Sequence, residues 1–158
     1  MTDPVSLHRY LDVELISVQL DIRSRKKLLQ EMARLLSSPL TGCKEKDVYH
    51  LLLEREKLGN TGIGNGVALP HSRCEKTDRA VVAIITVREP IDYDSLDRQA
   101  VNLAFGLLVP QSATSEHLGL LAEIAKFLSD GENKQRLCEA RSAQQIVDLL
   151  TPTSEKNA

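Results

Sequence analysis

Two long apolar runs constrain the fold more strongly than any other part of the sequence. Residues 80–87 and 101–109 are apolar at almost every position, so neither run alternates as a strand with one face in water would. Runs of this kind are typical of central strands that are covered on both faces. Together with helical segments before and after them, they predict an α/β fold in which buried central strands are flanked by helices on both faces.

Helical periodicity begins near Ser24, where apolar residues recur on one face until Pro39 and Gly42 interrupt the pattern. A weaker alternation at residues 14–20 predicts a further strand. No repeat or linker divides the chain, so a single domain over residues 1–158 is expected. The expected core covers about 10–150, and the polar tail at 151–158 is expected to fray. The expected helices lie at about residues 24–36, 45–57, 116–129, 134–140 and 142–150.

Composition and charge exclude several classes of protein. The 158 residues have a net charge of −2, 3% aromatic residues and no tryptophan, which removes the usual basis for binding nucleic acid or an anionic membrane. No apolar run approaches the roughly 18 residues of a transmembrane helix. The first residues lack the basic and apolar regions of a signal peptide. Cys43, Cys74 and Cys138 are odd in number and widely spaced, which indicates thiols in a reducing compartment and a cytoplasmic location.

A glycine-rich stretch leads directly to one histidine, in the sequence Gly62-Ile-Gly-Asn-Gly-Val-Ala-Leu-Pro-His71. Its glycines allow positive φ angles or a close approach of the backbone to another group. Residues 67–69 then have the composition of a buried strand, and Pro70 stiffens the chain before His71. The imidazole is therefore expected at a rigid strand end, where its ring can be held at a set distance from another reactant.

The spacing of these glycines does not fit two common phosphate-binding motifs. A Walker loop has lysine after its second glycine, whereas Asn65 follows Gly64 here. A dinucleotide fingerprint starting at Gly62 needs a third glycine at position 67, which is valine. A plain tight turn remains as an alternative to a functional loop.

Two further residues are candidates for a site around His71. Arg55 continues the inward stripe of the second expected helix, where a guanidinium needs an anionic partner. Alternatively, its side chain extends to water at the helix end or meets a nearby carboxylate. His117 falls in the first turn of the third expected helix and on its inner face. It is either a core-edge histidine with one hydrogen bond or an active-site imidazole at a helix N-terminus, a position that favours a phosphoryl group.

Metal binding has weaker support in the sequence. Three aspartates lie in the charged connection at 90–97, but the calcium pattern also needs a glycine and a later glutamate that are absent from this register. We therefore expect that connection to be a solvated turn. His71, Cys74 and His117 are a possible zinc set, although H-x-x-C supplies only half of such a site. No metal is expected.

Several segments are together similar to one protein family. They are Arg55-Glu56, the run from Gly59 to His71, Pro90-Ile-Asp-Tyr-Asp-Ser-Leu-Asp97, Leu107-Leu-Val-Pro110 and His117-Leu-Gly-Leu-Leu-Ala-Glu-Ile-Ala125. These segments resemble the enzyme IIA domains of the fructose/mannitol type, which belong to the bacterial phosphoenolpyruvate-dependent phosphotransferase system. The resemblance covers roughly residues 10–150 and is strongest for the stand-alone, nitrogen-regulatory branch. Ser72 departs mildly from the family, which usually has a small residue, often glycine, at this position.

The resemblance implies that His71 carries a phosphoryl group. A neutral imidazole suits this role, because its ordinary pKa of about 6.5 leaves it nucleophilic near neutral pH. The resemblance also implies a mixed sheet packed between helices, and it implies that Arg55 and His117 stabilise the transferred group. The implied active-site loop consists of Thr61, Gly62, Gly64, Asn65 and Gly66.

The implied function is that of a phosphotransferase with a phosphohistidine intermediate and a mainly regulatory role. The implied donor is an HPr-like phosphocarrier protein of the nitrogen branch, and the implied targets are regulatory partners in nitrogen or potassium metabolism. No cofactor is expected, because positioning and charge carry the catalysis of such a transfer. Two alternatives remain: relay to a sugar-specific IIB component of fructose/mannitol-type uptake, and a binding module whose surface charge is switched by phosphorylation.

Overall fold

The computed structural model describes residues 7–37, 42–112 and 115–152, with the side chains of residues 115–117 outside the description. The helices are η1 (Leu7–Tyr10), η2 (Val13–Leu15), α1 (Arg25–Leu36), α2 (Glu45–Leu58), α3 (Ser115–Leu128), α4 (Gly131–Glu139) and α5 (Ala143–Leu150). The strands are β1 (Ile16–Leu20), β2 (Gly62–Gly64), β3 (Val67–Ala68), β4 (His71–Cys74), β5 (Val81–Ile91) and β6 (Val101–Pro110). The expected helices and the two buried strands are confirmed, whereas most of the expected frayed tail lies outside the described residues.

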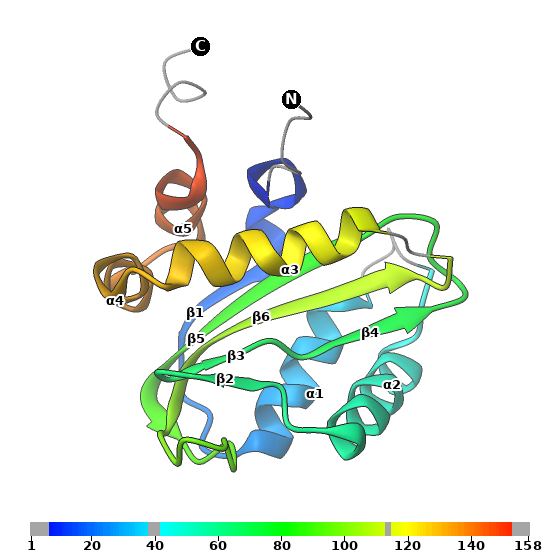
Figure 1. Cartoon of the computed structure of the whole chain (residues 1–158), viewed down its shortest axis with the longest axis horizontal. Coiled ribbons are helices and arrows are strands. Elements are labelled where there is room, and N and C mark those ends of the chain that lie inside the picture. The colour runs from blue at the N-terminus through cyan, green and yellow to red at the C-terminus, as the bar shows by residue number, and fades with distance from the viewer. Residues whose placement is uncertain (1–6, 38–41, 113–114, 153–158) are drawn as a thin grey trace.

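The strands form one mixed sheet in the order β1-β5-β6-β3-β2, with β4 also paired to β6. The long strands β5 and β6 are antiparallel neighbours, and β1 runs parallel to β5. β3 and β4 both run parallel to β6, one after the other along the same edge of that strand. Figure 1 shows this arrangement, which is the mixed sheet that the family resemblance implied.

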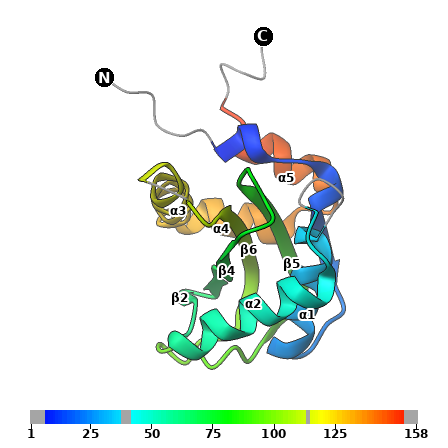
Figure 2. The same cartoon turned by 90° about the vertical axis from the view of Figure 1, so that its right-hand side faces the viewer.

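Helices cover both faces of the sheet (Figures 1 and 2). α1 and α2 pack on one face, and α3, α4 and α5 pack on the other. β5 contributes to both layers, because Ala83 and Ile85 belong to the first core while Val82 and Ile84 belong to the second. All four side chains are at most 1% exposed, which explains why this run has no alternating polar pattern.

Helix α1 begins after Ser24, whose hydroxyl accepts a hydrogen bond from the amide of Lys27 at 3.1 Å. Its apolar stripe is buried against β5 and β6. Met32 lies directly over Gly106 of β6, and a Cβ atom at position 106 would overlap the side chain of Met32. The close packing of α1 on the sheet therefore depends on a glycine at this point.

The connection between β5 and β6 differs from the solvated turn that the sequence suggested. Tyr93 is fully buried and Ser95 is nearly so, whereas the aspartates beside them are exposed. The expectation therefore holds for the three exposed aspartates, but it is wrong for Tyr93 and Ser95. Inward and outward residues alternate here, and the hydroxyl of Tyr93 donates to Glu56 inside the protein at 2.7 Å. The acidic residues of the segment thus face the solvent, while Tyr93 and Ser95 between them face the protein interior.

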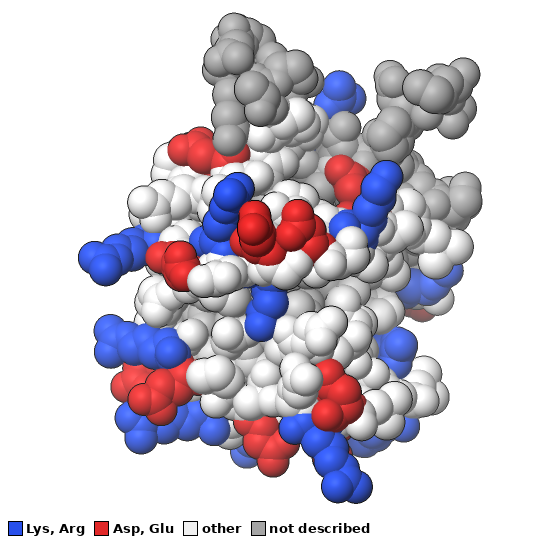
Figure 3. Space-filling view, turned by 60° about the vertical axis from the view of Figure 1, so that its left-hand side comes forward, with Lys and Arg blue, Asp and Glu red and all other residues white. Residues whose placement is uncertain are grey.

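The surface carries basic and acidic side chains in a mixed pattern on the face shown in Figure 3. No broad patch of one sign is visible on this face, in agreement with the net charge of −2. Among the helices in the described parts of the chain, none is long and apolar enough to cross a lipid bilayer.

Candidate active site

His71 is the first residue of β4. It directly follows residues 69–70, where the parallel pairing with β6 is interrupted between β3 and β4. β3 ends with Ala68 opposite Ala104, and the pairing resumes with His71 opposite Leu107. Pro70 lies in the gap, where it has no amide hydrogen to donate, but its carbonyl oxygen accepts a hydrogen bond from the amide of Leu107 at 3.0 Å. The backbone is thus held on both sides of His71, and the ring lies at the rigid strand end that the sequence predicted.

The imidazole of His71 is oriented by its own backbone. Nδ1 lies 2.6 Å from the carbonyl oxygen of Leu69. Because a carbonyl oxygen only accepts, Nδ1 carries the hydrogen in this contact. In the neutral ring, Nε2 then keeps its lone pair and is the nucleophilic nitrogen.

His71 lines a cavity of about 530 Å³ between α2, β4, β6 and α3. Most of the lining is aliphatic, with Leu51 and Leu58 from α2 and Leu118 and Leu121 from α3. Leu58 is 85% exposed and Leu118 is 67% exposed, so two large apolar side chains lie at the surface beside the half-buried histidine. An open apolar cavity with a few polar groups is the common form of a binding or active site.

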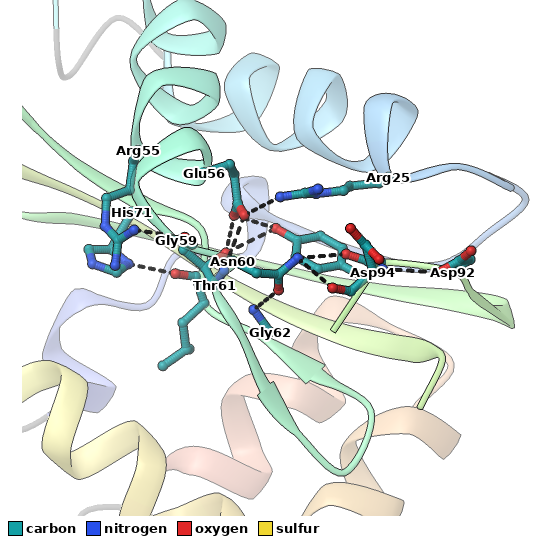
Figure 4. A network of polar contacts seen from close by, with 12 residues as sticks. Arg25, Arg55, Glu56, Gly59, Asn60, Thr61, Gly62, His71, Asp92 and Asp94 are labelled. Carbon is teal, nitrogen blue, oxygen red and sulfur yellow. Dashed lines mark hydrogen bonds and ion pairs between the residues drawn. The ribbon is translucent and has the colours of Figure 1, made fainter. Parts of the chain in front are cut away.

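Arg55 lies in the last turn of α2 and lines the same cavity as His71 (Figure 4). Its Nη1 donates to the carbonyl oxygen of Gly59 at 2.9 Å, which satisfies one acceptor at the C-terminal end of α2. Among the described residues, no carboxylate forms an ion pair with Arg55, and Glu54 of the same cavity pairs with Lys57 at 2.9 Å. The structure thus brings a guanidinium with remaining donors to the cavity that holds the imidazole.

His117 lies in the first turn of α3, as the sequence predicted, but its side chain is outside the described part of the structure. The residue that follows it, Leu118, lines the cavity. The N-terminal turn of α3 therefore borders the site, and the role of the His117 side chain stays a prediction.

The glycine-rich stretch forms a β-hairpin rather than a loop around the histidine. Asn65 and Gly66 have φ angles of 57° and 81°, which a two-residue type I′ turn between β2 and β3 requires. Gly64 also has a positive φ, of 98°. The turn lies at the opposite end of the sheet from the tip of β4 (Figure 1). These glycines serve the geometry of the hairpin.

None of the five predicted loop residues lines the cavity around His71. The backbone amides of Thr61, Gly62 and Asn65 already donate hydrogen bonds to side chains. The distances are 3.1 Å from Thr61 to Glu56, 2.7 Å from Gly62 to Asn60 and 2.9 Å from Asn65 to Asp97. The bond from Asn65 lowers the pKa of Asp97. The structure therefore does not present these amides to a group on His71.

Glu56, for which the sequence suggested no role, forms the centre of a buried polar cluster next to the site (Figure 4). Its carboxylate lies 2.5 Å from Nη2 of Arg25 and accepts a hydrogen bond from the hydroxyl of Tyr93 at 2.7 Å. Both the amide and the hydroxyl of Thr61 donate to it. The guanidinium of Arg25 also lies over the ring of Tyr93, 4.9 Å from its centroid.

Burial by itself raises the pKa of Glu56, but hydrogen bonds from Thr61, Tyr93 and Arg25 outweigh this effect and hold the pKa below its ordinary value. Burial also raises the pKa of Tyr93, so this hydroxyl stays protonated and donates. The available signal in the sequence was spacing, because Glu56 follows Val48 and Leu52 at intervals of four residues on the buried side of α2.

A chain of hydrogen bonds connects this carboxylate to the histidine. The amide of Thr61 donates to Glu56, and the carbonyl oxygen of Thr61 accepts from the amide of Leu69 at 2.9 Å. The carbonyl oxygen of Leu69 in turn accepts from Nδ1 of His71. Glu56 is therefore placed to fix the peptide groups that orient the imidazole.

In the described part of the chain, no group of three or more His, Cys, Asp or Glu side chains is placed to hold a metal ion. The zinc alternative also involved His117, whose side chain lies outside the description. Of its other members, His71 contacts Leu69 through Nδ1, and the sulfur of Cys74 contacts the sulfur of Cys43.

Comparisons with known proteins agree with this geometry. Residues 9–152 match the family model described as "Phosphoenolpyruvate-dependent sugar phosphotransferase system, EIIA 2". The chain is 41% identical over 137 residues to a nitrogen regulatory protein of Bradyrhizobium diazoefficiens, which covers 87% of this chain and 89% of that protein.

Solved structures show the same fold. Nitrogen regulatory protein IIA-Ntr from Neisseria meningitidis matches with a TM-score of 0.86 and 36% identity, over 92% of this chain and 99% of that chain. The mannitol enzyme IIA from Escherichia coli, in its complex with phosphorylated enzyme IIB, matches with a TM-score of 0.76 and 20% identity, over 89% and 96% of the two chains. At this identity, the second likeness concerns the fold alone.

Proposed function

The chain belongs to the EIIA 2 family of the phosphoenolpyruvate-dependent sugar phosphotransferase system, and from this premise we propose that it accepts a phosphoryl group on Nε2 of His71. The observation that supports this assignment most directly is the contact of Nδ1 with the carbonyl oxygen of Leu69 at 2.6 Å. This contact leaves Nε2 with the lone pair, in a side chain that lines the cavity.

The proposed step is a direct exchange between two histidines. Nε2 of His71 attacks the phosphorus of a phosphohistidine on the donor, a new N–P bond forms, and the donor imidazole leaves with the electron pair of the broken N–P bond. His71 keeps its hydrogen on Nδ1, so its ring becomes positively charged. The carbonyl oxygen of Leu69 accepts a hydrogen bond from Nδ1 and stabilises the charged ring.

Arg55 is the residue to which we assign stabilisation of the transferred group. It lines the cavity, it has donors beyond the one bonded to Gly59, and its charge complements the equatorial oxygens of a transferring phosphoryl group. We assign His117 the same role because it lies in the first turn of α3, where helix amides and the dipole favour an anion. The hairpin containing Thr61, Gly62, Gly64, Asn65 and Gly66 supports the site through the bond between Thr61 and Leu69.

The donor in this proposal is an HPr-like phosphocarrier protein of the nitrogen branch. The exposed apolar side chains of Leu58 and Leu118 beside His71 suit a protein surface better than a small sugar. A relative that matches most of the chain is named a nitrogen regulatory protein, which supports a mainly regulatory role. The mannitol enzyme IIA, with a phosphorylated IIB partner, offers the alternative of relay, but at 20% identity it supports that alternative less.

Phosphorylation in this proposal changes which partners bind. The phosphoryl group adds roughly −1.5 to −2 charges beside His71 at neutral pH. A regulatory partner with apolar or acidic groups around the cavity should then lose about 1–3 kcal/mol of binding free energy. Equal affinity of the unmodified protein, the phosphorylated protein and His71→Glu for such a partner would mean that the phosphoryl group does not control docking.

The test of function is incubation with phosphoenolpyruvate, enzyme I and the phosphocarrier protein. The wild-type chain should gain an acid-labile, alkali-stable phosphoryl group, and His71→Ala should gain none while keeping its fold. His50→Ala is the matched control, because His50 is exposed on α2 and should not be needed for labelling. Addition of a IIB component separates relay from regulation, since only a relay passes the label on.

A further inference from the structure

Two cysteines that are far apart in the sequence meet behind the site. The sulfur of Cys43 lies 3.0 Å from the sulfur of Cys74, and the two residues are only 5% and 6% exposed. A disulfide bond has a length of about 2.05 Å, so the two sulfur atoms need to approach by only about 1 Å to bond. The third cysteine, Cys138, lies on α4, where burial raises the pKa of its thiol.

The pair connects the two elements that carry the proposed phosphoryl site. Cys43 immediately precedes Lys44, the N-terminal cap of α2, and Cys74 is the last residue of β4. α2 provides Arg55 and β4 provides His71, and the cavity lies between these elements. A bond between the sulfurs would therefore tie together two walls of this cavity.

A small molecule has a route to the thiols. Both cysteines line a second cavity, of about 310 Å³, which shares Leu51 and Arg73 with the cavity around His71. This volume admits hydrogen peroxide easily. Because both cysteines are almost fully buried, a larger oxidant, such as a small-molecule disulfide or another protein, could not easily reach their sulfur atoms.

We propose that Cys43 and Cys74 are a redox modification site that forms a reversible disulfide with hydrogen peroxide as the oxidant. One thiolate attacks a peroxide oxygen, the O–O bond breaks, and a sulfenic acid and one water form once protons are exchanged. The second thiol attacks the sulfenic sulfur, the S–S bond forms, and the hydroxyl leaves as a second water. Two sulfurs are oxidised and one peroxide is reduced, and a dithiol reductant restores both thiols.

The consequence for phosphoryl transfer rests on the proposed function of His71. Formation of the disulfide would move the start of α2 relative to β4. This movement would change the distance and orientation between Arg55 on α2 and His71 on β4. Transfer depends on placement to within about 1 Å, so the oxidised protein should accept a phosphoryl group about tenfold more slowly.

The disulfide itself is tested on Cys138→Ser, which keeps only the pair among the three cysteines of the sequence. After treatment with hydrogen peroxide, intact-mass measurement should show the loss of two hydrogens, and peptide mapping without reductant should link Cys43 to Cys74. Cys43→Ala and Cys74→Ala, each in the Cys138→Ser chain, should instead show oxygen addition on the remaining thiol. Persistence of both thiols, or sulfinic acid on either cysteine of the intact pair, would overturn the proposal.

Phosphorylation rates of the same samples then test the coupling. The oxidised Cys138→Ser protein should be phosphorylated about tenfold more slowly than the reduced protein, and dithiothreitol should restore the rate. In the two alanine variants, peroxide should not produce this reversible loss of rate. Equal rates before and after disulfide formation would overturn the coupling and leave the disulfide standing. A protein that forms the disulfide but whose reduced form is never labelled on His71 would instead contradict the proposed function.

Discussion

Nδ1 of His71 lies 2.6 Å from the carbonyl oxygen of Leu69, the residue two positions earlier in the chain. The histidine is therefore oriented by the backbone of its own segment, across Pro70. The contact fixes which ring nitrogen holds the hydrogen, and so which nitrogen is free to react.

The first prediction concerns this tautomer in the unmodified protein. Nitrogen NMR of isotope-labelled protein, recorded with the ring of His71 neutral, should show Nδ1 of His71 protonated and Nε2 without a hydrogen. The exposed His50 is the internal reference for a ring on the surface. A spectrum in which Nε2 of His71 carries the hydrogen would contradict the orientation seen here.

The second prediction concerns Arg55. Arg55→Ala should slow phosphoryl transfer by about tenfold or more, because a charged donor to the transferring group is lost. Arg55→Lys should recover only part of the rate, since an ammonium keeps the charge but not the planar fork of donors. Rapid-quench measurements with a phosphorylated carrier give the rate, with His71 still the labelled residue.

Lys57→Ala is the control on the same helix, because Lys57 is exposed and pairs with Glu54. A rate for Arg55→Ala equal to that of this control would leave Arg55 without a part in transfer.

The third prediction concerns stability and pH through Glu56. Glu56→Gln removes a buried charge that pairs with Arg25, and it should lower the free energy of unfolding by about 3 kcal/mol at neutral pH. Denaturant unfolding measures the change. Glu54→Gln, on the exposed side of α2, should change stability little, because its carboxylate pairs with Lys57 at the surface, where ion pairs contribute little.

The pH dependence of the same variants has a definite sign. The pKa of Glu56 is lower in the folded protein than in the unfolded chain, so its contribution is fully present above the unfolded value of about 4.3. This contribution is lost as the pH falls from there through the folded pKa. The stability gap between wild type and Glu56→Gln should therefore narrow on acidification in this range. A gap that stays constant or widens would show that the carboxylate is not held ionised by its partners.

The fourth prediction concerns the hairpin. Gly66→Ala should lower stability by about 1–2 kcal/mol, because alanine disfavours a φ of 81°. A Cβ there would also lie 2.6 Å from the amine of Lys134 and 3.2 Å from the carbonyl oxygen of Ala100. Gly131→Ala is the control, because no atom lies within 4 Å of its added Cβ. Thermal unfolding distinguishes the two, and a neutral Gly66→Ala would argue against the turn described here.

The features that local patterns specify were predictable from the sequence. The stripe of α1, the buried runs of β5 and β6, and the rigid segment that leads through Pro70 to His71 follow from short-range patterns. The separate strand β4 that begins at His71 was not predicted. The candidate pair of Arg55 and His71 was also predictable, through the spacing of α2 and the family resemblance. The structure brings both residues to one cavity.

The features that escaped prediction depend on partners distant in the chain. Tyr93 is buried because it bonds to Glu56, which lies 37 positions earlier, and nothing in the acidic segment around Tyr93 indicates this. Cys43 and Cys74 are likewise brought together only by the packing of α2 beside β4. The family resemblance implied that hairpin residues form an active-site loop, but the acceptors of their amides, such as Asp97 for Asn65, lie far away in the sequence.

The most direct test of the central claim is nitrogen and phosphorus NMR of the isotope-labelled chain after phosphorylation by phosphoenolpyruvate, enzyme I and the carrier protein. We predict one phosphohistidine, at residue 71, with N–P coupling to Nε2 and a hydrogen retained on Nδ1. Coupling at Nδ1 of His71, or a phosphoryl group on His50 or His117, would contradict the account.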